Sequence, residues 1–465
     1  MATVAGVDSS TQSCKVVVCD ADTGEVLARG SAPHPDGTEV PPEAWWTALQ
    51  QAGEGLLDNV DAVSIAGQQH GLVALDDSHR PVRDALLWND VRSADAADDL
   101  VAELGGPQAW LDAVGSVPVA AFTAAKLRWM ADHEPELADR VTRVMLPHDY
   151  LTWRLLGGSD AAPTTTDRSD ASGTGYWSAV EGRYREDLLA LAFRNRTPQL
   201  PRVLEPSESA GRTASGALVA AGAGDNAAAA LGLGIGDGDV VISLGTSGTA
   251  FARTSQLHTD AFVNGFADAT GQFLPLVCTL NAARVLEAMA TALRIGIGEL
   301  DALGRQAPPG ADGLVLLPYL SGERTPNLPH ATGSLHGLRA ETMRPAHLAR
   351  AAVEGMLCNM ADALDRLRAA GATPRRVLLI GGGSRSAFVA ETAAHILGAA
   401  VTVPAPEEYV ALGAARQAAW VLRGGAEPPR WPAAAAVEIP ASGDDAVGER
   451  IRTAYTQARN ALYGN

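Results

Sequence analysis

Two segments about half a chain apart share one pattern, a strand, a turn of small residues and a second strand. The first turns at "SSTQS" (residues 9–13) and the second at "GTSG" (residues 245–248). Apolar, β-branched runs on both sides of such turns are typical of β-hairpins. One hairpin in each half predicts two related domains that face each other, residues 1–230 and residues 231–465.

Strands and helices alternate along the rest of the chain, which favours mixed α/β layers. We expect a helix over residues 44–57, a strand over 60–67, and a strand, a glycine turn and a helix over 375–398. A Pro/Ala-rich stretch, residues 423–442, reads as a loop before a last helix at 445–463. With 465 residues the chain exceeds what one core usually serves, and this again predicts two domains.

The composition of the chain argues against several classes of protein. The net charge is −18, which argues against a protein that binds nucleic acid or an anionic membrane. Four cysteines without a CxxC pair fit a reducing compartment. Asp8 interrupts any signal-peptide core, and glycines and polar residues interrupt the weakly polar run 217–235. We expect a soluble, cytoplasmic protein without a membrane partner.

The stretch "AAGAGDNAAAALG" places Asp225 between glycines and an Ala-rich helix. A carboxylate at a buried corner costs desolvation free energy unless it is used. The glycines also fit a dinucleotide-binding pattern, but the acid expected about twenty residues later is absent. A helix-capping Asp is the structural alternative. A carboxylate at a helix N-terminus, where the helix dipole favours the ionised form, can accept a proton.

Nucleotide binding would need an unusual route, because the chain has only two lysines, Lys15 and Lys126, and neither follows glycine as in a P-loop. The two hairpin turns instead offer backbone N–H groups and hydroxyls to phosphate oxygens. The turn "GGGSRS" (residues 381–386) lets a flat group such as adenine or ribose lie against the backbone. Two matching hairpins, the first preceded by Asp8, favour a phosphate clamp over ordinary turns.

The chain resembles the FGGY family of carbohydrate kinases. The similar stretches follow in order: "VDSSTQSCKVVV", "IAGQQHG", "LLWND", "FTAAKLRWM", "MLPHDYL", "SDASGT", "GAGDNAAAALG", "SLGTSG", "LPYLSGERTP", "LIGGGSRS" and "ALGAARQA". The resemblance implies an actin-like ATPase fold, in which two RNase H-like domains enclose a ligand cleft. It implies ATP-dependent, Mg²⁺-assisted phosphorylation of D-xylulose, with the sugar bound by the N-terminal domain and the nucleotide by the C-terminal domain.

The resemblance also assigns roles. It makes Asp225 the general base and Asp8 the carboxylate near the metal. The implied sugar-binding residues are Gln69, His70, Trp88, Asn89, Asp90 and Asn226. The implied nucleotide-binding residues are Ser10, Thr11, Gln12, Lys15, Gly245, Thr246, Ser247, Gly382, Gly383 and Ser386. The chain departs from the commoner family pattern at Gln69, where Met is usual, and at Ser10 and Ser13, where Gly is usual.

Two alternatives stay open. The same chemistry could act on another ketopentose, a pentitol, glycerol or a sugar acid. A non-catalytic actin-like protein could instead use ATP as a switch for a protein partner, since fold alone does not decide function. The joint presence of Asp225, His70 and Asp8 favours the kinase. Its expected ligands are a small sugar and ATP, and the resemblance suggests a homodimer.

Overall fold

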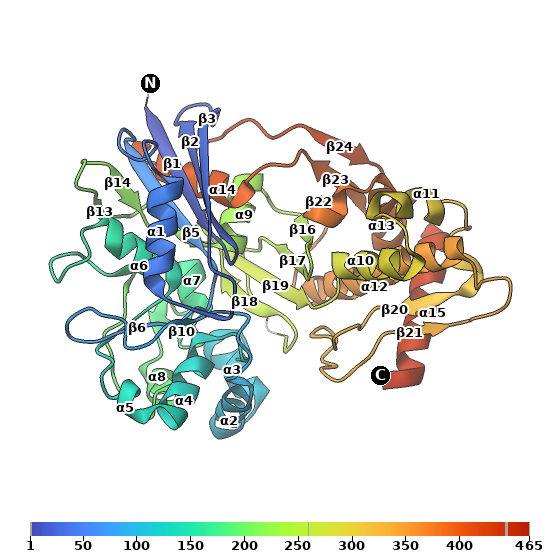
Figure 1. The fold of residues 1–465 in the computed structure, drawn as a ribbon, viewed down its shortest axis with the longest axis horizontal. Helices are drawn as coiled ribbons and strands as arrows, with labels where there is room; N and C mark the ends of the chain where they lie inside the picture. Colours follow the sequence, from blue (N-terminus) through green and yellow to red (C-terminus); the bar gives the residue numbers. More distant parts are fainter. Residues whose placement is uncertain (1, 259, 442–444, 465) are drawn as a thin grey trace.

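The computed structural model describes residues 2–258, 260–441 and 445–464. Within them lie two seven-stranded sheets, one in each half of the chain, as Figure 1 shows. The first has the order β13-β14-β5-β1-β2-β3, with β15 beside β5, and the second the order β18-β19-β17-β16-β22-β23-β24. The mixed α/β architecture predicted from the sequence is confirmed.

The strands of the first sheet are β1 (Thr3–Ser9), β2 (Ser13–Asp20), β3 (Val26–Pro33), β5 (Ala62–Gly67), β13 (Ser209–Arg212), β14 (Leu218–Ala220) and β15 (Ala223–Gly224). Those of the second are β16 (Asp239–Leu244), β17 (Gly248–Ala252), β18 (Asn264–Ala267), β19 (Phe273–Thr279), β22 (Arg376–Ile380), β23 (Ala400–Pro404) and β24 (Ala436–Ile439). Short pairs are β4 (Glu39–Val40) with β7 (Ala85–Leu86), β6 (Val73–Leu75) with β8 (Arg143–Met145), β9 (Thr165–Asp167) with β12 (Arg202–Leu204), β10 (Trp177–Ser178) with β11 (Arg183–Tyr184), and β20 (Val315–Leu317) with β21 (Ser334–His336).

The α-helices are α1 (Pro42–Ala52), α2 (Ala94–Leu104), α3 (Pro107–Val114), α4 (Thr123–His133), α5 (Pro135–Ala138), α6 (Pro147–Leu155), α7 (Arg168–Ser172), α8 (Glu186–Ala192), α9 (Asp225–Leu233), α10 (Ala283–Leu293), α11 (Leu300–Gly304), α12 (Pro345–Ala369), α13 (Ala387–Leu397), α14 (Tyr409–Arg423) and α15 (Asp445–Tyr463). Short 3₁₀ turns are η1 (Ile297–Glu299), η2 (Ala311–Gly313) and η3 (Gly382–Arg385). Among the described residues, no helix combines the length and the apolar character that crossing a bilayer requires.

Both predicted hairpins are present, and each has a parallel neighbour. Strand β1 pairs antiparallel with β2 and parallel with β5, while β16 pairs antiparallel with β17 and parallel with β22. The two sheets therefore repeat one arrangement. Because the carboxyl ends of parallel strands share an edge, each hairpin turn lies beside the loop that leaves its parallel neighbour.

The segment 423–442 corrects one prediction, because it was expected to be a loop and contains β24. This strand pairs antiparallel with β23, with Val437 opposite Val403. Its residues are largely exposed, as expected of an edge strand. The Pro and Ala residues before it hide the short β-branched alternation of Val437 and Ile439. The helix expected over 44–57 also ends early, at Ala52, because Gly53 terminates it.

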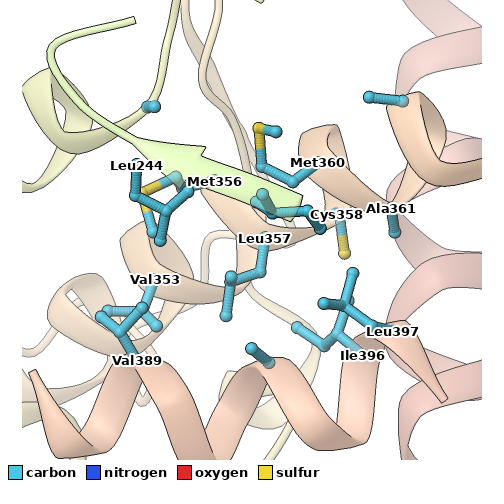
Figure 2. Close-up of a cluster of buried hydrophobic side chains, with 14 of the residues drawn as sticks. Leu244, Val353, Met356, Leu357, Cys358, Met360, Ala361, Val389, Ile396 and Leu397 are labelled. Carbon is cyan, nitrogen blue, oxygen red and sulfur yellow. The ribbon is translucent and has the colours of Figure 1, made fainter. Parts of the chain in front are cut away.

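A hydrophobic core around α12 supports the second hairpin (Figure 2). Leu244, the last residue of β16, is fully buried beside Met356 of α12, in a cluster that also contains Val353 of α12 and Val389 of α13. The strand end that precedes the turn 245–247 is thereby fixed by close packing, although the turn itself is partly exposed.

Helices α9 and α14 form a seam of small residues between the two sheets. Residues of α9 pack on the second sheet, and residues of α14 pack on the first sheet, against β1 and β5. A Cβ atom at Gly413 would come within 1.8 Å of the Ala228 carbonyl oxygen, and one at Gly232 within 2.0 Å of the Tyr409 carbonyl oxygen. The two helix backbones approach so closely only because these positions are glycine. The domain division at residue 230 stays a prediction.

We expect Gly413→Ala to destabilise the protein by about 1–3 kcal/mol, because the added methyl group meets the backbone of α9. The midpoint of thermal unfolding, followed by circular dichroism, measures the effect. Gly298→Ala is the matched control, since a Cβ atom there meets nothing within 4 Å. Equal unfolding midpoints for the two variants would contradict the role of the seam.

Candidate active site

Three parallel strands end together at one edge of the first sheet. In β1 and β5, Ser9 pairs with Gly67, and Gly67 in turn pairs with Gly224 of β15. Asp8 precedes Ser9, the segment 68–70 follows Gly67, and Asp225 follows Gly224. The predicted metal carboxylate, sugar-binding segment and general base thus leave the sheet at the same edge.

Asp225 begins α9, and extended Gly224 serves as the N-cap position. Its Oδ1 accepts hydrogen bonds from the backbone N–H of Asn226 at 2.7 Å and from the Asn226 Nδ2 at 2.8 Å. Burial, and then the negative charge of Asp8, raise the pKa of Asp225 to about 7. A carboxyl group whose pKa lies near the working pH is suited to take a proton and release it again.

Asp8 is buried, at 4% exposure, and accepts a hydrogen bond from the Ser10 hydroxyl. Burial raises its pKa to about 6, although Ser10 and the nearby charge of Lys15 oppose that shift. Lys15 lies opposite Asp8 in the sheet register, but its ammonium group is 2.6 Å from Glu408. Within the described residues no ion pair reaches Asp8, and its charge is therefore open to a cation.

The first hairpin turn is closed by a hydrogen bond from the Ser10 N–H to the Ser13 carbonyl at 3.1 Å. The Thr11 hydroxyl accepts a hydrogen bond from the Trp88 indole at 2.8 Å, which joins this turn to the predicted sugar-binding segment. Gln12 is exposed at the tip. Of the predicted nucleotide-binding residues in this turn, Thr11 already has a protein partner.

His70 has a left-handed backbone, with φ of 71°, and its Nδ1 lies 2.6 Å from the Gly173 carbonyl oxygen. The ring stacks on Phe122, with centroids 4.9 Å apart, and lies 5.6 Å from the ring of Phe266 in the second sheet. Burial lowers the pKa of His70 to about 3, so the ring is neutral. Because Nδ1 donates to the carbonyl, Nε2 keeps a lone pair that can accept from a hydroxyl group.

The polar side chains of the segment 88–90 have different surroundings. Asp90 is bound to its neighbour Arg92, with the guanidinium Nε 2.8 Å from its Oδ1, and to the Thr38 hydroxyl at 2.7 Å. Its carboxylate is engaged within the protein. Asn89 has a buried side-chain oxygen without a partner among the described residues, as a ligand-facing amide would.

The second hairpin turn and the glycine-rich turn share one edge of the second sheet, because β16 and β22 run parallel with Ser243 opposite Ile380. Gly245 and Thr246 accept hydrogen bonds from the start of α10 through their carbonyl oxygens. Thr246 is exposed, and Ser247 is partly exposed. The turn is therefore held from the start of α10 through its carbonyl oxygens, and its tip is exposed to solvent.

Gly381 has φ of 87°, and a Cβ atom there would lie 2.8 Å from the Leu244 carbonyl. A Cβ atom at Gly382 would meet nothing within 4 Å, so its backbone face is open, while Gly383 is packed on Leu244. Ser386 has a structural role. Its hydroxyl caps α13 by accepting from the Val389 N–H at 2.9 Å, and it donates to the Asp301 carboxylate at 2.7 Å.

Ser169 of α7 is a site residue that the sequence did not single out. Its hydroxyl donates to Asp167 at 2.6 Å and accepts from the Gly224 N–H at 3.0 Å, next to Asp225. Its carbonyl accepts from the Gln69 Nε2 at 3.1 Å. The stretch "SDASGT" entered the resemblance without a role, and only the fold brings it to both segments.

Gln417 of α14 was also missed. Its Oε1 accepts from the Gly222 N–H at 3.0 Å and from the Ser64 hydroxyl at 2.6 Å, and its Nε2 donates to the Gly222 carbonyl at 2.9 Å. A polar amide within the Ala-rich stretch "ALGAARQAAW" was the signal in the sequence that could have identified it, and the structure buries it at 1% exposure.

The loop "GERTP", residues 322–326, contacts β19, because the Thr325 hydroxyl donates to the Cys278 carbonyl at 2.9 Å. Glu323 is buried and accepts from Asn281 at 2.9 Å and from Asn359 at 2.8 Å. Burial is the main cause of the low pKa of His70, and the hydrogen bond to the Gly173 carbonyl opposes it. The positive charge of the next residue, Arg324, lowers this pKa further. A guanidinium group near His70 gives this part of the site a positive charge.

Comparisons with known proteins agree on the family. The N-terminal domain model of the FGGY family of carbohydrate kinases matches residues 3–237, and its C-terminal domain model matches residues 240–422. The chain is 47% identical to a xylulose kinase of Streptomyces coelicolor over 483 aligned residues, covering 99% of this chain and 97% of that protein. It is also 47% identical to a xylulose kinase of Streptomyces rubiginosus, covering 90% and 88%.

A solved structure supports the same assignment. The crystal structure of xylulose kinase from Bifidobacterium adolescentis superposes with a TM-score of 0.91 at 44% identity, covering 98% of this chain and 99% of that one. The predicted actin-like ATPase fold is thereby confirmed. The chain belongs to the FGGY family of carbohydrate kinases and is a sugar kinase.

Proposed function

We propose that this kinase transfers the γ-phosphoryl group of ATP to the 5-hydroxyl of D-xylulose, giving D-xylulose 5-phosphate and ADP. The observation that carries the proposal is the convergence of Asp8, the segment 68–70 and Asp225 at one edge of the first sheet. Relatives named xylulose kinase, 47% identical over most of their length, support D-xylulose as the acceptor.

Asp225 takes the proton of the attacking hydroxyl in this proposal. Phosphoryl transfer has a loose transition state, so positioning and charge neutralisation supply most of the catalysis. The ionised carboxylate is aligned by two hydrogen bonds to its Oδ1 from Asn226, which leaves Oδ2 for the sugar. The start of α9 favours the ionised form.

The sugar is held by side chains that still have open hydrogen-bonding capacity. His70 offers its Nε2 to a hydroxyl group, Asn89 offers a buried oxygen, and Asn226 keeps its own amide oxygen. Trp88 forms part of the wall, anchored through Thr11. Asp90 shapes this wall through its bond to Arg92, and its direct contact to the sugar stays a prediction.

ATP binds, in this proposal, with its phosphates between the two hairpin turns and its adenosine against Gly382 and Gly383. Mg²⁺ fits the donor set, because Asp8 is a buried carboxylate that no ion pair reaches among the described residues, and hard cations prefer oxygen ligands. When bound, the ion neutralises charge on the phosphates. Asp8 would hold it, while Ser10 keeps that carboxylate oriented.

The four cysteines are free thiols, three of them buried, which fits our proposal of a cytoplasmic enzyme. The homodimer stays a prediction.

The experiment that tests the function is ADP release with ATP and a panel of acceptors: D-xylulose, D-ribulose, L-xylulose, D-gluconate, glycerol, xylitol and none. We expect D-xylulose to exceed every other acceptor by at least about tenfold in kcat/KM, the selectivity that about 1.4 kcal/mol provides. Chelation of Mg²⁺ should abolish the signal. A preference for another acceptor would contradict the substrate, and a rate independent of every acceptor would favour the ATP-binding switch protein.

Asp225→Asn should lower kcat by about 10²–10⁴-fold, because the amide cannot accept the proton. KM for both substrates should change little, since the shape of the side chain is kept. The measurement is steady-state ADP release at saturating D-xylulose. A variant with full turnover would remove Asp225 from the role of general base.

The pH profile should follow the ionisation of Asp225. Only the ionised carboxylate accepts a proton, and its pKa is raised to about 7, so kcat/KM should fall as the pH decreases through that value and level off above it. The decline should approach about tenfold per pH unit on the acid side. The limb should disappear in the residual activity of Asp225→Asn. A flat profile between about pH 5 and 8 would contradict this assignment.

A further inference from the structure

A completely buried histidine lies behind the site and contacts both of its segments. His148 is near the start of α6, and a Cβ atom at Gly222 would come within 2.4 Å of its ring carbon Cδ2. A Cβ atom at Gly67 would lie 2.9 Å from the His148 Cβ. Gly67 immediately precedes the segment 68–70, and Gly222 lies three residues before Asp225. One side chain therefore supports the backbone of the sugar-binding segment and that of the base.

Carboxylates surround this ring. Its Nδ1 lies 2.7 Å from Asp170 and 3.2 Å from Asp149, and its Nε2 lies 3.8 Å from Asp167 and 3.4 Å from the Ala221 carbonyl. Burial lowers the pKa of His148, but the three carboxylates outweigh burial and raise it to about 10. The raised pKa favours the imidazolium form, which donates from Nδ1 to Asp170. This cluster is an ion pair with additional carboxylates.

Asp170, the partner at 2.7 Å, belongs to α7, and α7 holds the site directly. Ser169 accepts hydrogen bonds from the Gly224 N–H and the Gln69 side chain. The Gly173 carbonyl, immediately after α7, accepts a hydrogen bond from the His70 ring. The His148–Asp170 bond connects α6 to α7 and so closes a continuous set of contacts around the site. Neither residue has a contact that would reach substrate, because both are at 0% exposure.

We propose that His148 and Asp170 form a positioning pair, which fixes the separation between the sugar-binding segment 68–70 and the base Asp225. This inference rests on the phosphoryl-transfer function proposed above. The acceptor hydroxyl must be held within about 3 Å of the base, and a displacement near 1 Å can cost about 10²-fold in rate. An ion pair that is anchored to both segments provides that precision. Neither residue takes part in the proton transfer.

The test uses His148→Gln, Asp170→Asn and the double variant, with steady-state kinetics on the full-length enzyme. Each single variant breaks the hydrogen-bonded ion pair between His148 and Asp170, and we expect kcat to fall by about 10²-fold while KM for ATP stays within about twofold. In the double variant an amide pair replaces the ion pair and can restore the hydrogen bond between α6 and α7, while Asp149 and Asp167 lose the imidazolium. Its kcat should recover to at least about tenfold above the single variants.

Glu354→Gln is the control for losing a buried carboxylate elsewhere. Glu354 of α12 is at 4% exposure and lies 3.1 Å from Arg350, distant in sequence and fold from the site residues. We expect this variant to unfold at a lower temperature and to keep its kcat. Circular dichroism and the unfolding midpoint confirm that each variant is folded at the assay temperature.

Folded single variants with wild-type kcat would overturn the positioning pair, and so would a double variant whose loss is the product of the two single losses. If His148→Gln does not fold, Asp170→Asn decides, because it removes one carboxylate from an acidic cluster and keeps the shape of the side chain. The wild-type enzyme is assayed in parallel. Wild-type protein without sugar-dependent ADP release would overturn the proposed function, whereas an active wild type with unaffected variants overturns only the pair.

Discussion

The close approach of α9 and α14 is the constraint on which the site depends. Gly232 and Gly413 let the two helix backbones pack with no side chain between them. Packed interiors do not deform continuously, so this contact fixes the start of α9, and with it Asp225, relative to the first sheet. Gln417 of α14 extends the same contact to Gly222, just before the base. Small residues chosen for packing therefore determine where the carboxylate points.

Burial raises the pKa of both carboxylates at the site, Asp8 and Asp225. The negative charge of Asp8 raises the pKa of Asp225 further. A site that is negative before ligands bind would repel the anionic phosphates of ATP. In the function that we propose, a divalent cation at Asp8 would resolve that conflict, and it would also lower the pKa of nearby acids. Binding of metal and nucleotide would then favour the ionised, base-competent form of Asp225. This order would couple nucleotide binding to activation of the proposed base.

The sequence alone predicted the two hairpins and the α/β architecture that surrounds the site. The duplicated hairpins appear because their β-branched runs and small turns are local signals, and Asp225 was recognisable because a carboxylate among glycines has no packing reason to be there. The short strand β24 was missed, since its alternation is brief and it is defined by pairing with β23. The bonds from Ser169 to Gly224 and from His148 to Asp170 join residues 55 and 22 positions apart. Such contacts depend on the tertiary fold, and no local pattern encodes them.

Gln69 illustrates how the fold changes the meaning of a substitution. The commoner family residue is Met, and an amide at this position could have altered sugar recognition directly. The Gln69 side chain instead donates to the Ser169 carbonyl at 3.1 Å and fills the space where a Cβ atom at Gly224 would come within 2.7 Å of its Cγ. Its amide therefore acts on the backbone beneath the base, as an additional link between α7 and the segment 68–70. In the function that we propose, selection among sugars would then rest with His70, whose neutral ring still has an open acceptor.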